Sequence, residues 1–303
     1  MKEHIFDDPS SLSHEDSQPT FTRNNVECSA PKVQPTPDIE KKYVHRVYDA
    51  IAPHFSSTRF AKWPKVQSFL NSMPRGSLVL DAGCGNGKYL GLNPNCYYIG
   101  CDISSPLVNI CADKGNEVLV ADAVNLPYRS SYGDAAISIA VLHHLSTEQR
   151  RRRAVEELIR VVKRGGLVLI TVWAREQEDD SLVRKWTPVS VKYEEEWIEA
   201  GSVVVPPVTT TASSLECIPE GQEYFVPWHL PYHRAEVGGG ASADAVASGF
   251  ARKDDKKSAV VYDRYYHVFT EGELERLVEG VDDAVVADKF FDKSNWCIIL
   301  EKT

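Results

Sequence analysis

Short runs of apolar residues alternate along the middle of this chain with segments in which apolar residues recur every three or four positions. The first pattern is typical of buried strands and the second of amphipathic helices. Strands are predicted over residues 78–82, 97–102, 117–121, 134–141 and 167–173. Helices are predicted over residues 39–52 (ended by Pro53), 64–71, 105–114 and 147–162 (capped by Ser146 or Thr147). Strands that alternate with helices indicate a parallel sheet with helices on both faces.

The ends of the chain and one internal region depart from this alternation. Residues 1–38 are rich in Ser, Pro and Asp, so we expect a disordered acidic tail before a single domain over 39–303. Residues 175–260 break the pattern, and we interpret them as a partly flexible insertion. Order is expected to return near residue 261, and the segments 285–291 and 296–300 predict a closing antiparallel hairpin.

Three glycines at alternate positions follow the first predicted strand. The stretch from Asp81 reads D-A-G-C-G-N-G, with glycines at 83, 85 and 87. Glycine tolerates positive φ and lets a ligand approach the backbone closely. A strand, a glycine loop and a helix start indicate a site for a nucleotide-type cofactor.

Two further acids narrow the choice of cofactor. Asp102 ends the second predicted strand, where a carboxylate would accept hydrogen bonds from ribose hydroxyls. Asp122 follows the third strand, where it could read an adenine amino group. An NAD enzyme would normally lack this second acid, and Gly87-Lys88-Tyr89 does not complete a P-loop.

The glycine loop, Asp102 and Asp122 together resemble the class I S-adenosylmethionine-dependent methyltransferases over about residues 76–173. The resemblance implies an α/β Rossmann-like fold with a mostly parallel seven-stranded sheet. It also implies that the loop packs under the methionine moiety, with Asp81 near its amino end. The residues implied to bind S-adenosyl-L-methionine are Asp81, Gly83, Cys84, Gly85, Gly87, Asp102, Asp122, Ala123 and Ala140.

The methyl acceptor is narrowed by what the chain lacks. Methylation of base amino groups usually shows an N/D-P-P-Y/F loop after the fourth strand, and here that position reads A-V-L-H-H-L from Ala140. Methylation of pyrimidine C5 needs a cysteine nucleophile, whereas the cysteines here are better read as small buried residues. An oxygen or carboxylate acceptor remains.

Segments outside the glycine-loop region carry a more specific resemblance. The stretches from Tyr48 to Arg59, Phe225 to Trp228 and Arg264 to Phe269 are similar to the eukaryotic tRNA wobble-uridine carboxymethyl methyltransferases of the stand-alone type. This implies methyl esterification of 5-carboxymethyluridine at tRNA position 34. It also implies two partners, the tRNA anticodon stem-loop and a small zinc-binding activator subunit. The third predicted strand is an apolar edge on which the activator could pair.

The implied chemistry needs little from the protein. A carboxylic acid with a pKa near about 4 is already ionised at neutral pH, so its oxygen needs no general base. The site must align and orient it. Arg59 is the leading candidate for this role, against the alternative of a surface arginine.

Other candidate residues surround the expected cleft. His143, beside the fourth strand, is a candidate catalytic residue, and one member of the pair His143-His144 is expected to be structural. The residues expected to bind substrate are Arg59, His144, Trp228, Arg264, Tyr265 and His267. For Tyr266 we favour simple packing in a strand. The run Arg150-Arg151-Arg152-Arg153 has two open interpretations, a solvated helix face or a contact with tRNA phosphates.

Composition bounds these interpretations. The net charge of −9 disfavours a nucleic-acid partner without excluding local basic patches, because screening limits distant charges to about 8 Å. Seven cysteines without a C-x-x-C pair suggest reduced thiols and no metal site. With neither a signal peptide nor an 18-residue apolar run, we expect no membrane association and a cytoplasmic location, with the nucleus as a second compartment.

Two rival functions remain at this point. The first is a small-molecule O-methyltransferase of the quinone-pathway kind, which would not explain the Arg264–Phe269 segment. The second is a non-catalytic scaffold that only binds the cofactor. The intact glycine loop and its acids argue against the scaffold.

Overall fold

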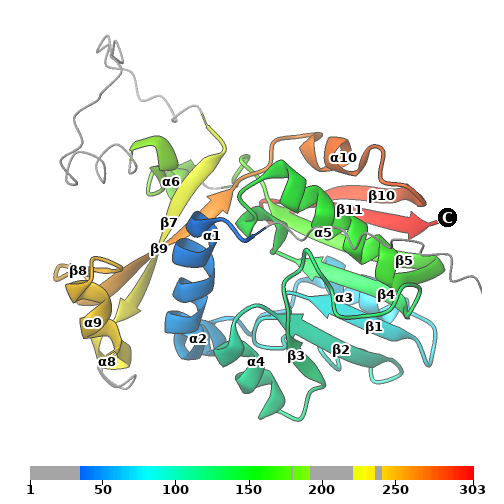
Figure 1. Ribbon diagram of the computed structural model, residues 1–303, viewed down its shortest axis with the longest axis horizontal. Helices are drawn as coiled ribbons and strands as arrows, with labels where there is room; N and C mark the ends of the chain where they lie inside the picture. The colour runs from blue at the N-terminus through cyan, green and yellow to red at the C-terminus, as the bar shows by residue number, and fades with distance from the viewer. Residues whose placement is uncertain (1–34, 179, 192–220, 236–240) are drawn as a thin grey trace, which may run out of the picture. The chain divides into compact units, whose positions relative to one another are not determined.

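The computed structural model describes residues 35–303 except for 179, 192–220 and 236–240. Most of the expected acidic tail and much of the predicted insertion therefore lie outside the described residues. The described part contains a seven-stranded sheet and a separate four-stranded sheet (Figure 1).

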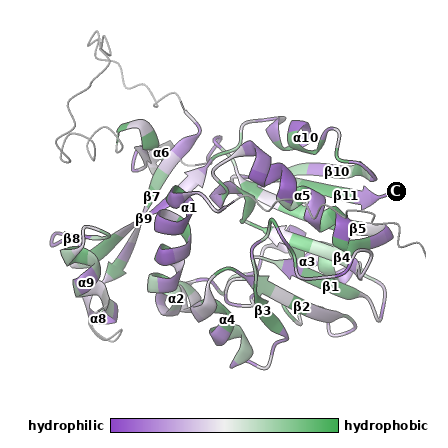
Figure 2. Ribbon diagram, in the orientation of Figure 1, coloured by the Kyte–Doolittle hydropathy of each residue, from purple (hydrophilic) through white to green (hydrophobic). Residues whose placement is uncertain are grey.

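The seven-stranded sheet has the order β10-β11-β5-β4-β1-β2-β3. Strands β1 to β5 pair in parallel, whereas β11 pairs antiparallel with both β5 and β10, as the sequence predicts. The strands are β1 (Leu78–Ala82), β2 (Tyr97–Asp102), β3 (Val118–Val120), β4 (Gly133–Ile139), β5 (Val162–Trp173), β10 (Ala284–Asp292) and β11 (Asn295–Lys302). Figure 2 shows apolar residues concentrated in the central strands, which the helices cover.

Helices pack on both faces of this sheet because successive strand residues point to opposite sides. In β1, Leu80 joins an apolar cluster with α5 (Glu148–Val161) and α10 (Glu273–Val278). Its neighbour Val79 joins a second cluster with α3 (Pro64–Asn71). Helix α4 (Ser105–Ala112) follows β2. The cap of α5 is Thr147, whose hydroxyl oxygen accepts a hydrogen bond from the Arg150 amide at 3.3 Å.

The N-terminal helical segment runs further than predicted. It comprises α1 (Asp38–Glu40), a π-helical turn over Lys41–His45 and α2 (Arg46–Thr58), and Pro53 lies inside α2 instead of ending it. Proline removes one backbone hydrogen bond from a helix. Packing beyond the proline offsets that loss, because the rings of His54 and Phe55 lie 5.5 and 5.9 Å from that of Trp228.

The region predicted as an insertion contributes the four-stranded sheet, in the order β6-β7-β9-β8. Its strands are β6 (Thr187–Pro188), β7 (Glu223–Pro231), β8 (Arg252–Asp254) and β9 (Ala259–His267), accompanied by the short helices α6 (Asp180–Val183), α8 (Tyr232–Ala235) and α9 (Ala241–Ala247). Val47 and Ile51 of α2 are buried against Trp228 and Tyr262 of this sheet. The sheet therefore packs on the N-terminal segment.

No helix in the described residues is long and apolar enough to cross a membrane. Across the same part of the chain, no three His, Cys, Asp or Glu side chains gather as ligands for a metal ion.

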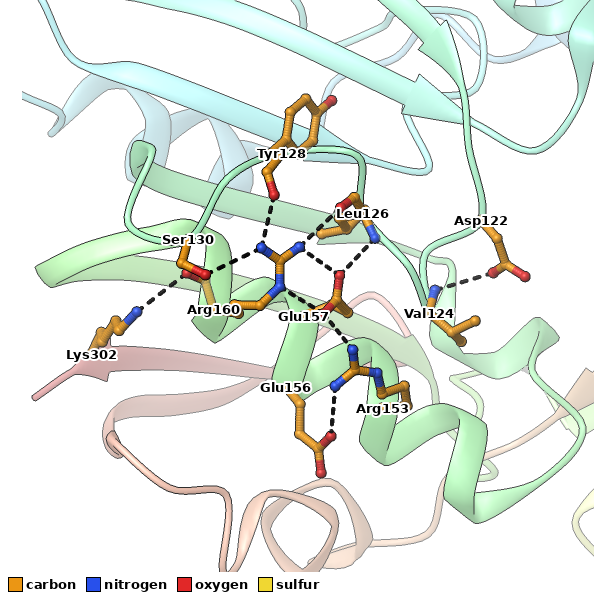
Figure 3. Close-up of polar contacts among 10 residues, drawn as sticks. All are labelled: Asp122, Val124, Leu126, Tyr128, Ser130, Arg153, Glu156, Glu157, Arg160 and Lys302. Carbon is orange, nitrogen blue, oxygen red and sulfur yellow. Dashed lines mark hydrogen bonds and ion pairs between the residues drawn. The ribbon is translucent and has the colours of Figure 1, made fainter. Parts of the chain in front are cut away.

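A buried carboxylate ties the segment after β3 to helix α5 (Figure 3). Glu157 is fully buried and accepts hydrogen bonds from the Leu126 amide, from Arg153 and, through two nitrogens, from Arg160. Arg160 also donates to the carbonyl oxygens of Leu126 and Tyr128. The network fixes the segment that continues from Asp122, whose carboxylate accepts from the Val124 amide at 3.1 Å.

Removing the charge of Glu157 should destabilise the fold. We expect Glu157→Gln to lower the free energy of unfolding by about 2–3 kcal/mol, because two guanidinium groups lose a buried ionic partner. Urea unfolding would measure this loss. Glu156→Gln is the matched control, since its single ion pair with Arg153 is largely solvated and worth about 0.5 kcal/mol. Equal losses in the two variants would contradict the role given to Glu157.

Candidate functional site

A cavity lies at the carboxyl ends of β1, β2 and β4, where parallel α/β sheets bind ligands. Its walls come from the glycine loop, the N-terminal helical segment, the segments after β3 and β4, and strand β9. The expected site residues that line it are Arg59, Asp81, Gly83, Cys84, Gly85, Asp102, Asp122, Ala123, Ala140, His143, His144 and Arg264.

The glycine loop has the backbone that its sequence predicts. Gly83, Gly85 and Gly87 have φ values of +85°, +56° and +76°. A Cβ on Gly83 would lie 2.2 Å from a methyl carbon of Val141, so only glycine fits there. Gly87 does not line the cavity, and a Cβ on it would press on the Cys111 sulfur at 3.1 Å. Gly87 therefore shapes the loop from behind.

Asp81 is the strongest indication of what the cavity binds. Its side chain is buried, and its Oδ2 has no hydrogen-bond partner among the described residues. Burial raises the pKa of Asp81 to about 7, with a further contribution from Asp102 and partial opposition from Lys88. An unpaired buried carboxyl facing a cavity fits a cationic ligand group, such as the amino group of a methionine moiety.

Asp102 holds the glycine loop in place. One carboxylate oxygen accepts from the Gly85 amide and the other from the Ser104 amide, both at 2.9 Å. Burial raises the pKa of Asp102, while these amide donors oppose the rise. The ribose contact expected of Asp102 stays a prediction. The amide bonds set the position from which the carboxylate would make it.

Asp122 belongs to a buried ion cluster that sequence reasoning missed. Arg150 donates from Nη2 to Asp122 at 3.0 Å and from Nε to both oxygens of Glu40, at 3.1 and 3.0 Å. The side chains of Arg150 and Glu40 are almost fully buried. Glu40, from α1, also accepts from the Ser146 amide and hydroxyl. One arginine therefore joins the N-terminal segment, α5 and the cavity acid.

The four arginines of the run have different surroundings in the structure. Arg150 and Arg151 are buried, and Arg151 donates to the Leu145 carbonyl. Arg152 donates to the Glu279 carbonyl, and Arg153 forms ion pairs with acids of its own helix. The interpretation as a solvated face is therefore wrong for Arg150 and Arg151, whereas Arg152 and Arg153 stay partly exposed and their contact with tRNA phosphates stays a prediction.

The histidine pair lies after β4 in a 3-10 turn (Leu142–His144). The Trp173 amide donates to Nδ1 of His143 at 3.2 Å, so a neutral His143 carries its proton on Nε2. Burial lowers the pKa of both histidines well below the ordinary value, so both are neutral near pH 7. His143 can therefore donate a hydrogen bond but does not act as a base at its Nδ1.

The residue leading into this turn has a strained backbone. Ala140 has a φ of +62°, a conformation that is uncommon for residues other than glycine. Its amide donates to the backbone and side-chain oxygens of Thr171, at 3.0 and 3.1 Å. These bonds hold Ala140 against the cavity, as expected for a strained residue at a functional site.

The guanidinium groups of two arginines lie against the same aromatic ring. Arg59 and Arg264 each lie 4.9 Å from the ring centroid of Trp228. Trp228 is itself buried, donates to His54 Nδ1 at 3.1 Å and does not line the cavity. The expected substrate contact of Trp228 therefore stays a prediction, and in the structure its ring packs against the two cations. Burial and the neighbouring Arg264 lower the pKa of Arg59.

Strand β9 presents a different set of residues from the one predicted. Tyr265 packs with Tyr43 and Phe225, and His267 lies between the carboxylates of Glu223 and Glu273, at 2.6 Å from each. Neither lines the cavity. Arg264 and Tyr266 lie on the opposite face and do line it, because side chains alternate along a strand. Tyr265 and His267 thus lie away from the cavity and their substrate roles stay predictions, whereas Tyr266, expected only to pack in the strand, lines the cavity.

The N-terminal segment supplies five lining residues that were not among the expected site residues, namely Glu40, Val44, His45, Tyr48 and Phe55. Asn86 of the glycine loop holds this segment by donating to the carbonyl oxygens of Ser56 and Arg59, at 3.2 and 2.9 Å. Alternation along β9 could have revealed Tyr266, but no local signal marks Glu40 as a partner of Arg150.

Comparisons with known proteins agree with this site. A family model described as a methyltransferase domain matches residues 80–170. A tRNA (carboxymethyluridine(34)-5-O)-methyltransferase from Arabidopsis thaliana is 58% identical over 96% of this chain and 88% of its own length. One from Schizosaccharomyces pombe is 37% identical over 88% of this chain and 98% of its own. The Xenopus tropicalis protein named tRNA (carboxymethyluridine(34)-5-O)-methyltransferase alkbh8 is 43% identical over 87% of this chain, which spans only 41% of it.

The raised pKa of Asp81 predicts how cofactor affinity depends on pH. A ligand ammonium needs the ionised carboxylate, so binding below pH 7 requires Asp81 to lose its proton. The affinity for S-adenosyl-L-homocysteine, the demethylated cofactor, should therefore fall about tenfold from about pH 7.5 to 6 in calorimetric titrations.

Asp81→Asn is the control for this prediction. The variant should bind S-adenosyl-L-homocysteine more weakly, with little dependence on pH. His143 and His144 should not mask the effect, because their lowered pKa values keep them neutral over this range. An unchanged pH dependence in the variant would assign it to another group.

Proposed function

The chain belongs to the family of tRNA (carboxymethyluridine(34)-5-O)-methyltransferases, and on that premise we propose that it methylates the carboxylate of 5-carboxymethyluridine at tRNA position 34. The methyl donor is S-adenosyl-L-methionine, which supplies an electrophilic methyl group when bound. The unpaired carboxyl of Asp81 and the tight turn at Gly83 fit its amino-acid end.

The observation that carries this proposal is a cavity lined both by buried acids, which suit the cofactor, and by two arginines, which suit an anionic RNA substrate. Asp81 and Asp102 lie at the glycine loop, whereas Arg59 and Arg264 lie against Trp228. A carboxylate oxygen is already a nucleophile near pH 7, so the neutral histidines suit a reaction without a general base. The chain's part is to position the carboxylate and exclude water.

Methyl transfer to defined RNA tests the proposal. The full chain, labelled S-adenosyl-L-methionine and the activator are incubated with anticodon stem-loops that carry 5-carboxymethyluridine or plain uridine at position 34. We expect label only in the carboxymethyl RNA, and we expect alkali to release it as methanol because the product is an ester. Label confined to small metabolites would favour the quinone-pathway type of enzyme. Cofactor binding without transfer would favour a scaffold.

A small zinc-binding activator is the proposed protein partner, and edge strand β3 is its proposed docking site. Within the part of the chain that the structure describes, β3 pairs with β2 alone, and Val120 at its end is about half exposed. An uncovered apolar edge strand offers unpaired backbone groups and an apolar side chain to a partner strand. The family resemblance supplies the identity of this partner.

Charge on this edge should block the activator. We expect Val120→Glu to weaken activator binding at least about tenfold in calorimetric titrations, because a carboxylate would have to be buried. Val285→Glu is the matched control, since Val285 is similarly exposed on β10 at the opposite edge. Similar losses in both variants, or in neither, would place the activator elsewhere.

A further inference from the structure

Arg264 is a buried cation without an anionic partner. Its side chain is 5% exposed, and it lies between aromatic rings, 4.9 Å from the centroid of Trp228 and 5.0 Å from that of Tyr266. Its Nη1 donates to the Tyr266 hydroxyl at 2.8 Å, and its Nε has no partner. No carboxylate of the described residues forms an ion pair with it.

The polar groups around Arg264 are neutral, and their hydrogen bonds fix which atoms donate and which accept. His144 Nδ1 lies 3.0 Å from the Tyr265 carbonyl oxygen, which can only accept, so Nε2 must accept from the Tyr48 hydroxyl at 2.9 Å. Tyr48 has then used its proton on His144, and its hydroxyl lies close enough to Arg264 and Tyr266 to interact electrostatically with both. These groups fix the guanidinium group but bring no negative charge to it.

Other charged groups near Arg264 do not neutralise it either. Arg59 is a second cation on the same tryptophan ring. His143 stacks on Tyr266 with ring centroids 4.7 Å apart and is neutral. A buried charge without a counter-ion costs several kcal/mol, so Arg264 is a cation that no described residue neutralises and that a ligand anion would neutralise. Arg264 lines the cavity and can meet such a ligand.

We infer that Arg264 binds the carboxylate of the modified uridine and thereby distinguishes the acid from its uncharged amide. This inference rests on the proposed function and deepens it, because it names the residue that selects the charged substrate. In a desolvated site a guanidinium–carboxylate pair is much stronger than a guanidinium–amide contact. The amide would leave the Arg264 charge unpaired on binding.

Arg59 has a different part in this arrangement. Although its guanidinium group lies against Trp228, the residue as a whole is exposed to solvent, in contrast to the buried Arg264, and its backbone is held by Asn86. A solvated arginine attracts any anion, including the RNA backbone, without sensing one carboxylate. Arg59 is therefore expected to raise affinity for both RNAs equally, which makes it the matched control for Arg264.

The test compares binding of two anticodon stem-loops, one with 5-carboxymethyluridine and one with its amide, 5-carbamoylmethyluridine, at position 34. Dissociation constants are measured for the full chain saturated with S-adenosyl-L-homocysteine. The wild type should prefer the carboxylate RNA by about tenfold or more. Arg264→Gln should bring the ratio close to one, whereas Arg59→Gln should weaken both RNAs by a similar factor and keep the ratio.

Separate measurements test whether the Arg264 variants are folded and whether the proposed function is correct. Thermal unfolding and S-adenosyl-L-homocysteine affinity report whether Arg264→Gln is folded. If it is not, Arg264→Lys, which keeps the charge but loses the planar fork, should show a reduced but measurable preference. A folded Arg264→Gln that keeps the wild-type ratio overturns the inference, and so does a wild type without preference.

Methyl transfer by the wild type separates the two ideas. Transfer to the carboxymethyl RNA together with an unchanged ratio in Arg264→Gln would remove only the assignment of Arg264. Absence of any transfer would overturn the proposed function and the inference together.

Discussion

The cavity depends on one buried arginine that binds two carboxylates. Arg150 joins Glu40 of the N-terminal segment to Asp122 after β3. Breaking a buried ion pair by removing one partner costs about 3–5 kcal/mol. The wall formed by the N-terminal segment is therefore held to the sheet by charge as well as by apolar packing. The acid expected beside adenine is also part of the contact that positions this wall.

Much of the fold and the cofactor end could be predicted from the sequence, because the relevant signals are local. Apolar runs bounded by glycine or acid give the bounds of β1 and β2, and Pro64 begins α3 as its fixed φ favours. Asp81, Asp102 and Asp122 lie together because parallel strands end at the same edge of the sheet. Gly87 shows the limit, since glycine spacing does not tell a lining residue from one that packs behind the loop.

The residues around the expected methyl acceptor were harder to predict, because their positions depend on pairing between strands that are far apart in the sequence. Strand β9 pairs with β7 across a long stretch of sequence, and only this pairing places Arg264 and Tyr266 on the cavity side. Tyr265 and His267, which were expected to bind substrate, lie on the face of the strand that points away from the cavity. The arginine run was similarly ambiguous, because a sequence of four arginines looks the same whether it faces water or buried carboxylates. Pro53 likewise stays in a helix because of packing against a distant tryptophan.

The cavity wall spans the chain from Glu40 to Tyr266, whereas the glycine loop lies in its first third. During synthesis on the ribosome, the loop and its three acids emerge long before β9 does. A nascent chain would then carry the complete cofactor motif without Arg264, the buried cation of the site. Selection for the acceptor can therefore arise only after β9, the last strand of the second sheet, has been released.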